Sequence, residues 1–131
     1  MTQRTALLAG ATGLIGKHCL QLLLNDPVYS KVIVLTRRKL DIQHERLEQH
    51  VLDFETLAQH AALMKADDVF CTLGTTRKKS GGSQAAYEKI DYHYPVQIAT
   101  LAQRNGATQF LIVTSLGTRH DSSVFYLRLK A

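Results

Sequence analysis

The sequence has few of the features that mark several common protein classes. It contains only two cysteines, Cys19 and Cys71, and neither belongs to a C-x-x-C pair, so no zinc or dithiol motif is present. Both lie in apolar runs, which predicts buried, reduced thiols. No apolar run reaches the ~20 residues of a membrane-spanning helix, and the first one is too short for a signal peptide. We therefore expect a cytoplasmic protein without a membrane segment.

The histidines lack the spacing of a metal site, and the basic residues lack the pattern of a nucleic-acid-binding site. The six histidines show no paired spacing, so no metal site is predicted. Sixteen Lys and Arg against eleven Asp and Glu give a net charge of +5, which favours anionic partners without naming one. The basic run TTRKKSGG, residues 75–82, has no aromatic residue, so a nucleic-acid partner is not expected. This run is either a solvated loop or a contact for an anionic group.

What is present is the pattern of one globular α/β domain. Hydrophobic residues make up 45% of the chain and charged residues 21%, which fits a single domain over residues 1–131 with one core. Five apolar segments predict the strands of a parallel sheet, and the first two of them read as buried strands. These segments are residues 5–10, 31–38, 48–54, 66–74 and 108–117.

Helix-like segments separate these strands. Apolar residues recur at helical spacing over residues 14–25, and a short helical piece is predicted at about 55–62. The segment 83–105 contains Pro95, so we expect two helical parts that meet near Tyr94. The alternation predicts a Rossmann-like, doubly wound parallel sheet of about five strands in a three-layer α/β/α arrangement.

Three glycines lie where the first strand ends and the first helix begins. Gly10, Gly13 and Gly16 occur in GATGLIG, beside the crevice in which doubly wound sheets bind ligands. Gly10 would permit a tight turn, Gly13 would let a diphosphate approach the backbone, and Gly16 would let the helix pack on the strand. The N–H groups of the first helical turn would then face the phosphates. The spacing differs from the usual Gly-x-Gly-x-x-Gly, and a glycine-rich turn without a ligand is the alternative.

The end of the second strand indicates which nucleotide would bind. An acidic residue there would bond the adenosine ribose and exclude a 2′-phosphate. The sequence has LTRR instead, and Arg37 and Arg38 can offer guanidinium donors to a phosphate. We therefore expect NADP(H) rather than NAD(H), with two solvated arginines as the alternative. After the third strand, Asp53 can bond the adenine amino group or cap a helix.

Three residues near the end of the chain have the types and order of an oxidoreductase site. Tyr126 and Lys130 form Tyr-x-x-x-Lys, which places the phenol and the ammonium on one helical face. A nearby cation lowers the pKa of a phenol from its usual ~10. Ser115 ends the fifth predicted strand, and its hydroxyl can bond a substrate carbonyl while nicotinamide delivers a hydride. A half-buried tyrosine beside a solvated lysine is the alternative.

The chain resembles the short-chain dehydrogenase/reductase superfamily, and within it the atypical group around the Tat-interacting oxidoreductase-like proteins. The matching segments are LLAGATGLIGKH, VIVLTRR, DDVFCTLGTTRKKSGG, YEKIDYHYP, FLIVTSLG and FYLRLK. The resemblance implies that Ser115, Tyr126 and Lys130 are catalytic. The predicted cofactor-binding residues are Gly10, Thr12, Gly13, Leu14, Ile15, Gly16, Arg37, Arg38, Asp53, Phe54, Leu73, Gly74 and Thr75.

Members of that group continue beyond the catalytic lysine, whereas this chain stops at Ala131. We therefore expect residues 1–131 to lack the C-terminal substrate-binding part of the family. Two functions follow from the resemblance. One is an NADP(H)-dependent oxidoreductase in which Tyr126 donates or accepts the proton. The other is a non-catalytic NADP(H)-binding sensor or protein-interaction module. The small-molecule substrate stays undefined, and a homodimer or another protein partner fits either function.

Overall fold

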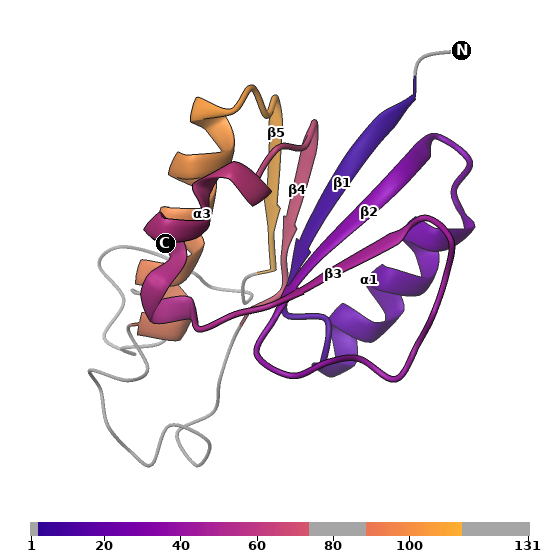
Figure 1. Cartoon of the computed structure of the whole chain (residues 1–131), viewed down its shortest axis with the longest axis horizontal. Helices are drawn as coiled ribbons and strands as arrows, with labels where there is room; N and C mark the ends of the chain where they lie inside the picture. The colour runs from indigo at the N-terminus through magenta and orange to yellow at the C-terminus, as the bar shows by residue number, and fades with distance from the viewer. Residues whose placement is uncertain (1–2, 74–88, 114–131) are drawn as a thin grey trace.

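A parallel β-sheet runs through the middle of the molecule (Figure 1). The computed structural model describes residues 3–73 and 89–113, and within these residues the sheet has five strands. They are β1 (Arg4–Ala9), β2 (Tyr29–Thr36), β3 (Leu47–Val51), β4 (Asp68–Cys71) and β5 (Gln109–Ile112). The strands lie in the order β3-β2-β1-β4-β5, and each neighbouring pair is parallel. This order confirms the predicted Rossmann-like doubly wound fold.

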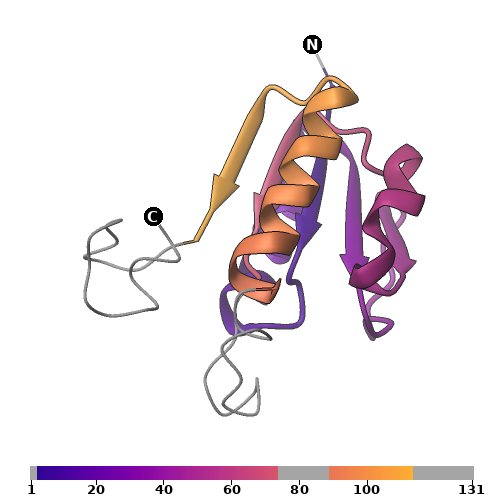
Figure 2. The ribbon, with the colours of Figure 1, turned by 90° about the vertical axis from the view of Figure 1, so that its left-hand side faces the viewer.

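Helices cover both faces of the sheet. α1 (Leu14–Asn25) follows β1 and packs on β1 and β2. On the opposite face, η1 (Phe54–Leu63) and α3 (Tyr94–Arg104) contact each other, and α3 also contacts β4. Figure 2 gives a second view of the layers, with α3 lying along the sheet and η1 beside it. No helix in the described part of the chain is long and apolar enough to cross a membrane.

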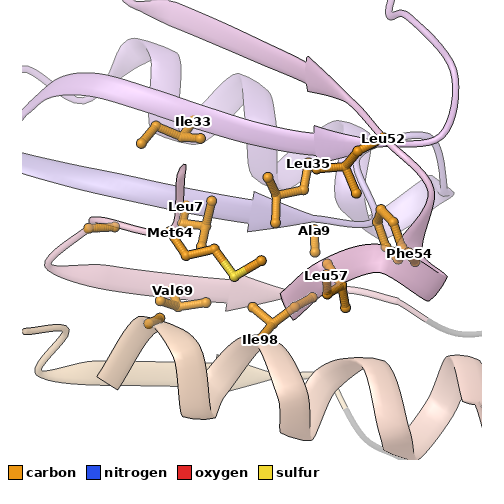
Figure 3. Packing of buried hydrophobic residues seen from close by; sticks show 12 residues of the cluster. Leu7, Ala9, Ile33, Leu35, Leu52, Phe54, Leu57, Met64, Val69 and Ile98 are labelled. Atoms are coloured by element: carbon orange, nitrogen blue, oxygen red, sulfur yellow. The ribbon is translucent and has the colours of Figure 1, made fainter. Parts of the chain in front are cut away.

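Residues 6–9 of the central strand β1 are buried on both faces, which explains their uninterrupted apolar sequence. Its side chains alternate between the two layers. Leu7 and Ala9 pack toward η1 and α3, whereas Ala6 and Leu8 pack toward α1. Figure 3 shows the first of these two clusters, which also contains Ile33, Leu35, Leu52, Phe54, Leu57, Met64, Ala66, Val69, Ile98 and Ala102.

The second strand ends two residues earlier than the sequence predicted. β2 ends at Thr36, and the predicted strand continued to Arg38. The hydroxyl of Thr36 donates to the Arg38 carbonyl at 2.7 Å and lies 3.3 Å from the Arg38 N–H, which donates to it. This side-chain turn diverts the backbone from the sheet. Arg37 and Arg38 therefore lie just beyond the carboxyl end of β2 rather than within it.

Two helical segments differ in type from an ordinary α-helix. The predicted piece after the third strand is the 3-10 helix η1, which non-helical backbone angles at Thr56 and His60 divide into short turns. Before α3, the π-helical turn η2 (Lys89–His93) leads directly into Tyr94, so two helical parts meet where they were predicted. Pro95 lies in the first turn of α3, which is the position where α-helices tolerate proline.

An ion pair closes the amino end of the sheet. Arg4 Nε and Nη2 donate to the two carboxylate oxygens of Asp68 at 2.9 and 2.7 Å, and the Tyr29 hydroxyl donates to Asp68 Oδ2 at 2.8 Å. The hydrogen bond from Arg4 lowers the pKa of Asp68. Burial, together with the bond to Asp68, raises the pKa of Tyr29 to about 12. These contacts join β1, β2 and β4 at the edge opposite their carboxyl ends.

Neither cysteine is in a disulfide, and the two differ in burial. Cys71 is buried at the end of β4, as predicted, whereas Cys19 of α1 is only partly buried. Burial still raises the pKa of the Cys19 thiol. The prediction of two buried thiols is therefore met fully by Cys71 and in part by Cys19, which lies at the border of the helix face that packs on the sheet.

Candidate functional site

The predicted cofactor residues of the described chain gather at one edge of the sheet. Gly10 follows β1, Arg37 follows β2, Asp53 lies two residues after β3, and Leu73 lies two residues after β4. The carboxyl ends of parallel strands meet at one edge, which is where doubly wound sheets bind ligands. Leu73 is partly buried and packs against the core cluster. Gly74, Thr75, Ser115, Tyr126 and Lys130 lie outside the described residues.

Two of the three loop glycines are required by the fold itself. Gly10 has φ +95°, which side-chain-bearing residues rarely adopt. A Cβ built on Gly16 would lie 1.9 Å from the carbonyl oxygen of Gly10, so no larger residue fits between α1 and the end of β1. These two glycines make the tight turn and the close approach of helix and strand that the sequence predicted for them.

Gly13 has a different environment. Its backbone lies in the extended region at φ −77° and ψ 171°, which any residue can adopt. A Cβ built there would meet only the carbonyl oxygen of Gly10, at an ordinary 3.7 Å. The protein therefore needs no glycine here for its own packing, and the main chain is left open to a group from outside. The loop fits a diphosphate in this respect.

The start of α1 offers free main-chain donors at the same place. Gly13 is the N-cap, no side chain caps the helix, and its first turn contains no acidic residue. Among the described residues, none accepts a hydrogen bond from the N–H groups of Leu14 and Ile15. Both side chains are exposed, Leu14 by 78% and Ile15 by 54%, and Thr12 is exposed as well. Unpaired N–H groups and the helix dipole favour an anion at this end.

Two cations stand beyond the end of β2. Arg37 and Arg38 are exposed, and neither guanidinium forms a hydrogen bond or ion pair with any residue that the structure describes. Arg37 is nonetheless close enough to Tyr94 to oppose the rise in the pKa of that phenol. Both guanidinium groups are therefore available to an anionic ligand at the same edge as the glycine loop.

Asp53 performs the capping role that the sequence left open. Its Oδ1 accepts a hydrogen bond from the Glu55 N–H at 2.9 Å, and its carbonyl accepts from the Thr56 N–H at 2.9 Å. The role of Asp53 toward adenine stays a prediction. Phe54 is only 4% exposed and belongs to the core, so any contact between Phe54 and a cofactor would come from its main chain.

The structure adds two contacts that the sequence did not indicate. The Tyr94 hydroxyl donates to Glu55 Oε1 at 2.7 Å, and its ring meets Phe54 edge to face with centroids 5.6 Å apart. Burial and the bond to Glu55 raise the pKa of Tyr94 to about 12. Thr72, directly after β4, contacts the Gly10 turn. No local pattern signals either contact, because Tyr94 and Glu55 are 39 positions apart in the chain and Thr72 and Gly10 are 62 apart.

Comparison with known proteins gives a family model and several curated relatives, including one from Rattus norvegicus and one from Candida glabrata. The model, described as NAD(P)H-binding, matches residues 10–129. Protein HTATIP2 of Rattus norvegicus is 36% identical over 134 residues, which cover 99% of this chain and 54% of that protein. Protein FMP52, mitochondrial, of Candida glabrata is 30% identical over 132 residues, which cover 99% of this chain and 55% of that protein. The chain thus spans about half the length of these curated relatives.

A solved structure gives the same fold. The crystal structure of a short chain dehydrogenase family protein from Francisella tularensis matches with a TM-score of 0.75, over 98% of this chain and 59% of that one. The two sequences are 16% identical. At that identity the likeness establishes the arrangement of strands and helices and nothing about the reaction.

Proposed function

The chain belongs to the NAD(P)H-binding family, among the atypical short-chain dehydrogenase/reductase-like proteins that its motifs indicated, and from this premise we propose a specific activity. The protein binds NADP(H) and serves hydride transfer between the nicotinamide and a carbonyl or alcohol substrate. The reaction, the coenzyme preference and the residue roles below are parts of this proposal.

The observation that carries the proposal is the uncapped start of α1. The N–H groups of Leu14 and Ile15 have no acceptor among the described residues, and Gly13 leaves the main chain open beside them. A helix N-terminus with free donors stabilises an anion. The loop from Gly10 to Gly16 would accommodate the coenzyme diphosphate there, with its main-chain N–H groups as donors.

The residues after β2 and β3 support NADP(H) over NAD(H). Arg37 and Arg38 stand where an acidic residue would bond the 2′-hydroxyl of NAD(H). A guanidinium can form two parallel hydrogen bonds with a phosphate, and both groups are free of partners within the described residues. Asp53 uses only Oδ1 for its cap, so Oδ2 would accept from the adenine amino group.

The proposed chemistry rests on residues assigned from the sequence. The coenzyme supplies or receives the hydride when it is bound. Ser115 would donate a hydrogen bond to the substrate carbonyl, and the phenol oxygen of Tyr126 would give or take the proton. Lys130 would stabilise the phenolate form of Tyr126 and so lower its pKa. Support comes from the Tyr-x-x-x-Lys spacing and from the position of all three after β5 in the chain.

Calorimetric titration of the 131-residue chain with NADPH and NADH tests the coenzyme part of the proposal. We expect saturable binding of both, with NADPH bound more tightly. Arg37→Asp should reduce the ratio of NADPH to NADH affinity by about tenfold or more, because it replaces a phosphate donor by a repelling charge. Arg104→Asp, which makes the same charge change at the exposed end of α3, is the control and should leave the ratio unchanged. An unaltered ratio in Arg37→Asp would contradict the assignment of the 2′-phosphate site.

Substitution of Tyr126 separates the oxidoreductase from the sensor. For the enzyme, Tyr126→Phe should abolish nearly all oxidation of NADPH in the presence of a panel of small aldehydes, ketones and quinones, while the calorimetric affinity for NADPH persists. Tyr92→Phe removes a hydroxyl from an exposed tyrosine and should retain turnover. If wild type and Tyr126→Phe bind NADPH equally and neither oxidises it with any of these carbonyl compounds, the result favours a non-catalytic sensor or interaction module over an enzyme.

A further inference from the structure

One side chain directly after β4 contacts the glycine turn that follows β1. Thr72 donates its main-chain N–H to the Ala9 carbonyl at 2.9 Å, which extends the pairing of β4 with β1 by one residue. Its hydroxyl lies 3.1 Å from the Ala9 carbonyl oxygen and 3.0 Å from that of Gly10, and donates toward both. The contact joins residues that are 63 and 62 positions apart in the chain.

The same hydroxyl occupies the space that two glycines leave. A Cβ on Gly10 would lie 2.6 Å from Thr72 Oγ1, and a Cβ on Gly16 would lie 2.7 Å from it. Real Cβ atoms do not approach other heavy atoms so closely. Gly10, Gly16 and Thr72 therefore form one interlocked group, in which the absence of two side chains makes room for a single hydroxyl.

This group determines which way the peptide units of the turn face. In a trans peptide the C=O and the following N–H point in opposite directions. Because the carbonyls of Ala9 and Gly10 face Thr72, the N–H groups of Gly10 and Ala11 point away from it. The Gly10 carbonyl also accepts from the Gly13 N–H at 3.2 Å, so its orientation affects the peptide that carries the open Gly13 position.

We propose that Thr72 is a positioning residue of the diphosphate-binding loop. Its hydroxyl holds the carbonyl oxygens of Ala9 and Gly10 toward β4, and the loop thereby presents N–H groups rather than carbonyl oxygens to the anion. A loop whose Gly10 peptide rotated would offer a carbonyl oxygen, which repels phosphate. The inference rests on the proposed function, because the ligand is the coenzyme diphosphate.

Two substitutions isolate the hydroxyl. Thr72→Ser keeps it and loses only a methyl group, whereas Thr72→Ala loses both, so the comparison of Ala with Ser measures the hydroxyl alone. Calorimetry should give an NADPH dissociation constant about five- to tenfold larger for Thr72→Ala than for Thr72→Ser, as expected for one lost hydrogen bond. Adenosine 2′-monophosphate, which has no 5′-phosphate and does not reach the loop, should bind both variants equally in an NMR titration.

A measurement without ligand tests the same role independently. Hydrogen exchange of the Gly13 amide, which donates to the Gly10 carbonyl, should be faster in Thr72→Ala and close to the wild-type rate in Thr72→Ser. Equal exchange rates and equal NADPH affinities in the two variants would overturn the role of Thr72. The role would also be overturned if Thr72→Ala weakened the binding of adenosine 2′-monophosphate as much as it weakened the binding of NADPH, because the effect would then be general destabilisation. Failure of the wild-type chain to bind NADPH would instead contradict the proposed function.

Discussion

At the scale of single residues, Gly13 and Gly16 are glycines for different physical reasons. Gly16 faces the carbonyl of Gly10, and a Cβ there would lie 1.9 Å from its oxygen. Gly13 has extended backbone angles, and a Cβ there would touch only one atom at 3.7 Å. Gly16 is therefore required by folding. Gly13 is not, and we propose that it is a glycine because the ligand approaches the main chain there.

Alanine substitutions should separate these two reasons. Gly16→Ala should lower the free energy of unfolding by about 3 kcal/mol or more, because the added methyl overlaps a backbone carbonyl that cannot move without the turn. Gly13→Ala should change it by no more than about 1 kcal/mol, because alanine restricts the unfolded chain but is a poorer N-cap than glycine, and the two effects oppose each other. Urea unfolding followed by circular dichroism measures both.

The Gly13→Ala variant also tests the binding of the coenzyme. Gly13→Ala should weaken NADPH binding in calorimetry although the protein stays as stable as wild type. A stable Gly13→Ala protein that binds NADPH with wild-type affinity would contradict the idea that Gly13 keeps the main chain open for the diphosphate. Retention of full stability by Gly16→Ala would contradict the packing shown by the structure.

At the scale of secondary-structure elements, the two ends of the sheet have opposite character. The amino end is closed by Arg4, Asp68 and Tyr29, which join β1, β2 and β4. The carboxyl end carries the glycine loop, the uncapped start of α1, and two arginines that have no partner among residues 3–73 and 89–113. One end is thus held by satisfied polar contacts, while the other carries the donors that we propose for the coenzyme.

The amino-end cluster predicts a dependence of stability on pH. The hydrogen bond from Arg4 lowers the pKa of Asp68 in the folded protein, so folding favours the ionised carboxylate. The stability that Asp68 contributes is complete above the pKa of about 4 that an aspartate has when unfolded, and it is lost as the pH falls through the lower folded value. The free energy of unfolding, measured in urea between pH 7 and pH 2, should therefore decrease below about pH 4.

A substitution assigns this effect to Asp68. Asp68→Asn should lower the free energy of unfolding at pH 7, and the difference from wild type should shrink as the pH falls below 4. Asp41→Asn, which changes an exposed aspartate, is the control and should follow the wild-type curve. Parallel curves for wild type and Asp68→Asn over the whole pH range would show that the pair with Arg4 does not control acid stability.

The loop between β2 and β3 is attached to α1 by one side chain. Arg46 Nη1 donates to the carbonyls of Asp26 and Tyr29 at 3.0 and 2.6 Å, and Nη2 donates to the carbonyl of Leu24. The C-terminal end of a helix has carbonyls without helical partners and a partial negative charge. The guanidinium of Arg46 supplies hydrogen-bond donors for these carbonyls and a positive charge beside the helix end. Arg46 thereby caps α1, whose own last turn contains no basic residue.

At the scale of the whole molecule, the order β3-β2-β1-β4-β5 is what assembles the candidate site. It places β2 and β4 on either side of β1, so that Arg37 and Thr72 come to the same edge as Gly10. The chain spans about half the length of its curated relatives, and the substrate, protein partners and cytoplasmic location stay proposals. The printed name of the Candida glabrata relative places that protein in mitochondria.

Much of this arrangement was readable from the sequence because burial on both faces leaves a continuous apolar run. β1, with Leu7 and Leu8 on opposite faces, was predicted from such a run. The helix α1 is buried on one face only and was predicted from the helical spacing of its apolar residues. The alternation of such strands and helices determined the doubly wound sheet, since parallel strands need crossovers. The glycine motif and LTRR indicated the edge and the kind of ligand.

Only the tertiary structure decided how the atoms of that edge are arranged. The end of β2 at Thr36 depends on one side-chain turn, and the 3-10 form of η1 depends on its short turns and on the cap from Asp53. Thr72 reaches the Gly10 turn through strand pairing across 62 positions of sequence. Local patterns predict which segments are buried, because burial repeats along the chain. They do not predict contacts between distant segments, because those exist only once the sheet has formed.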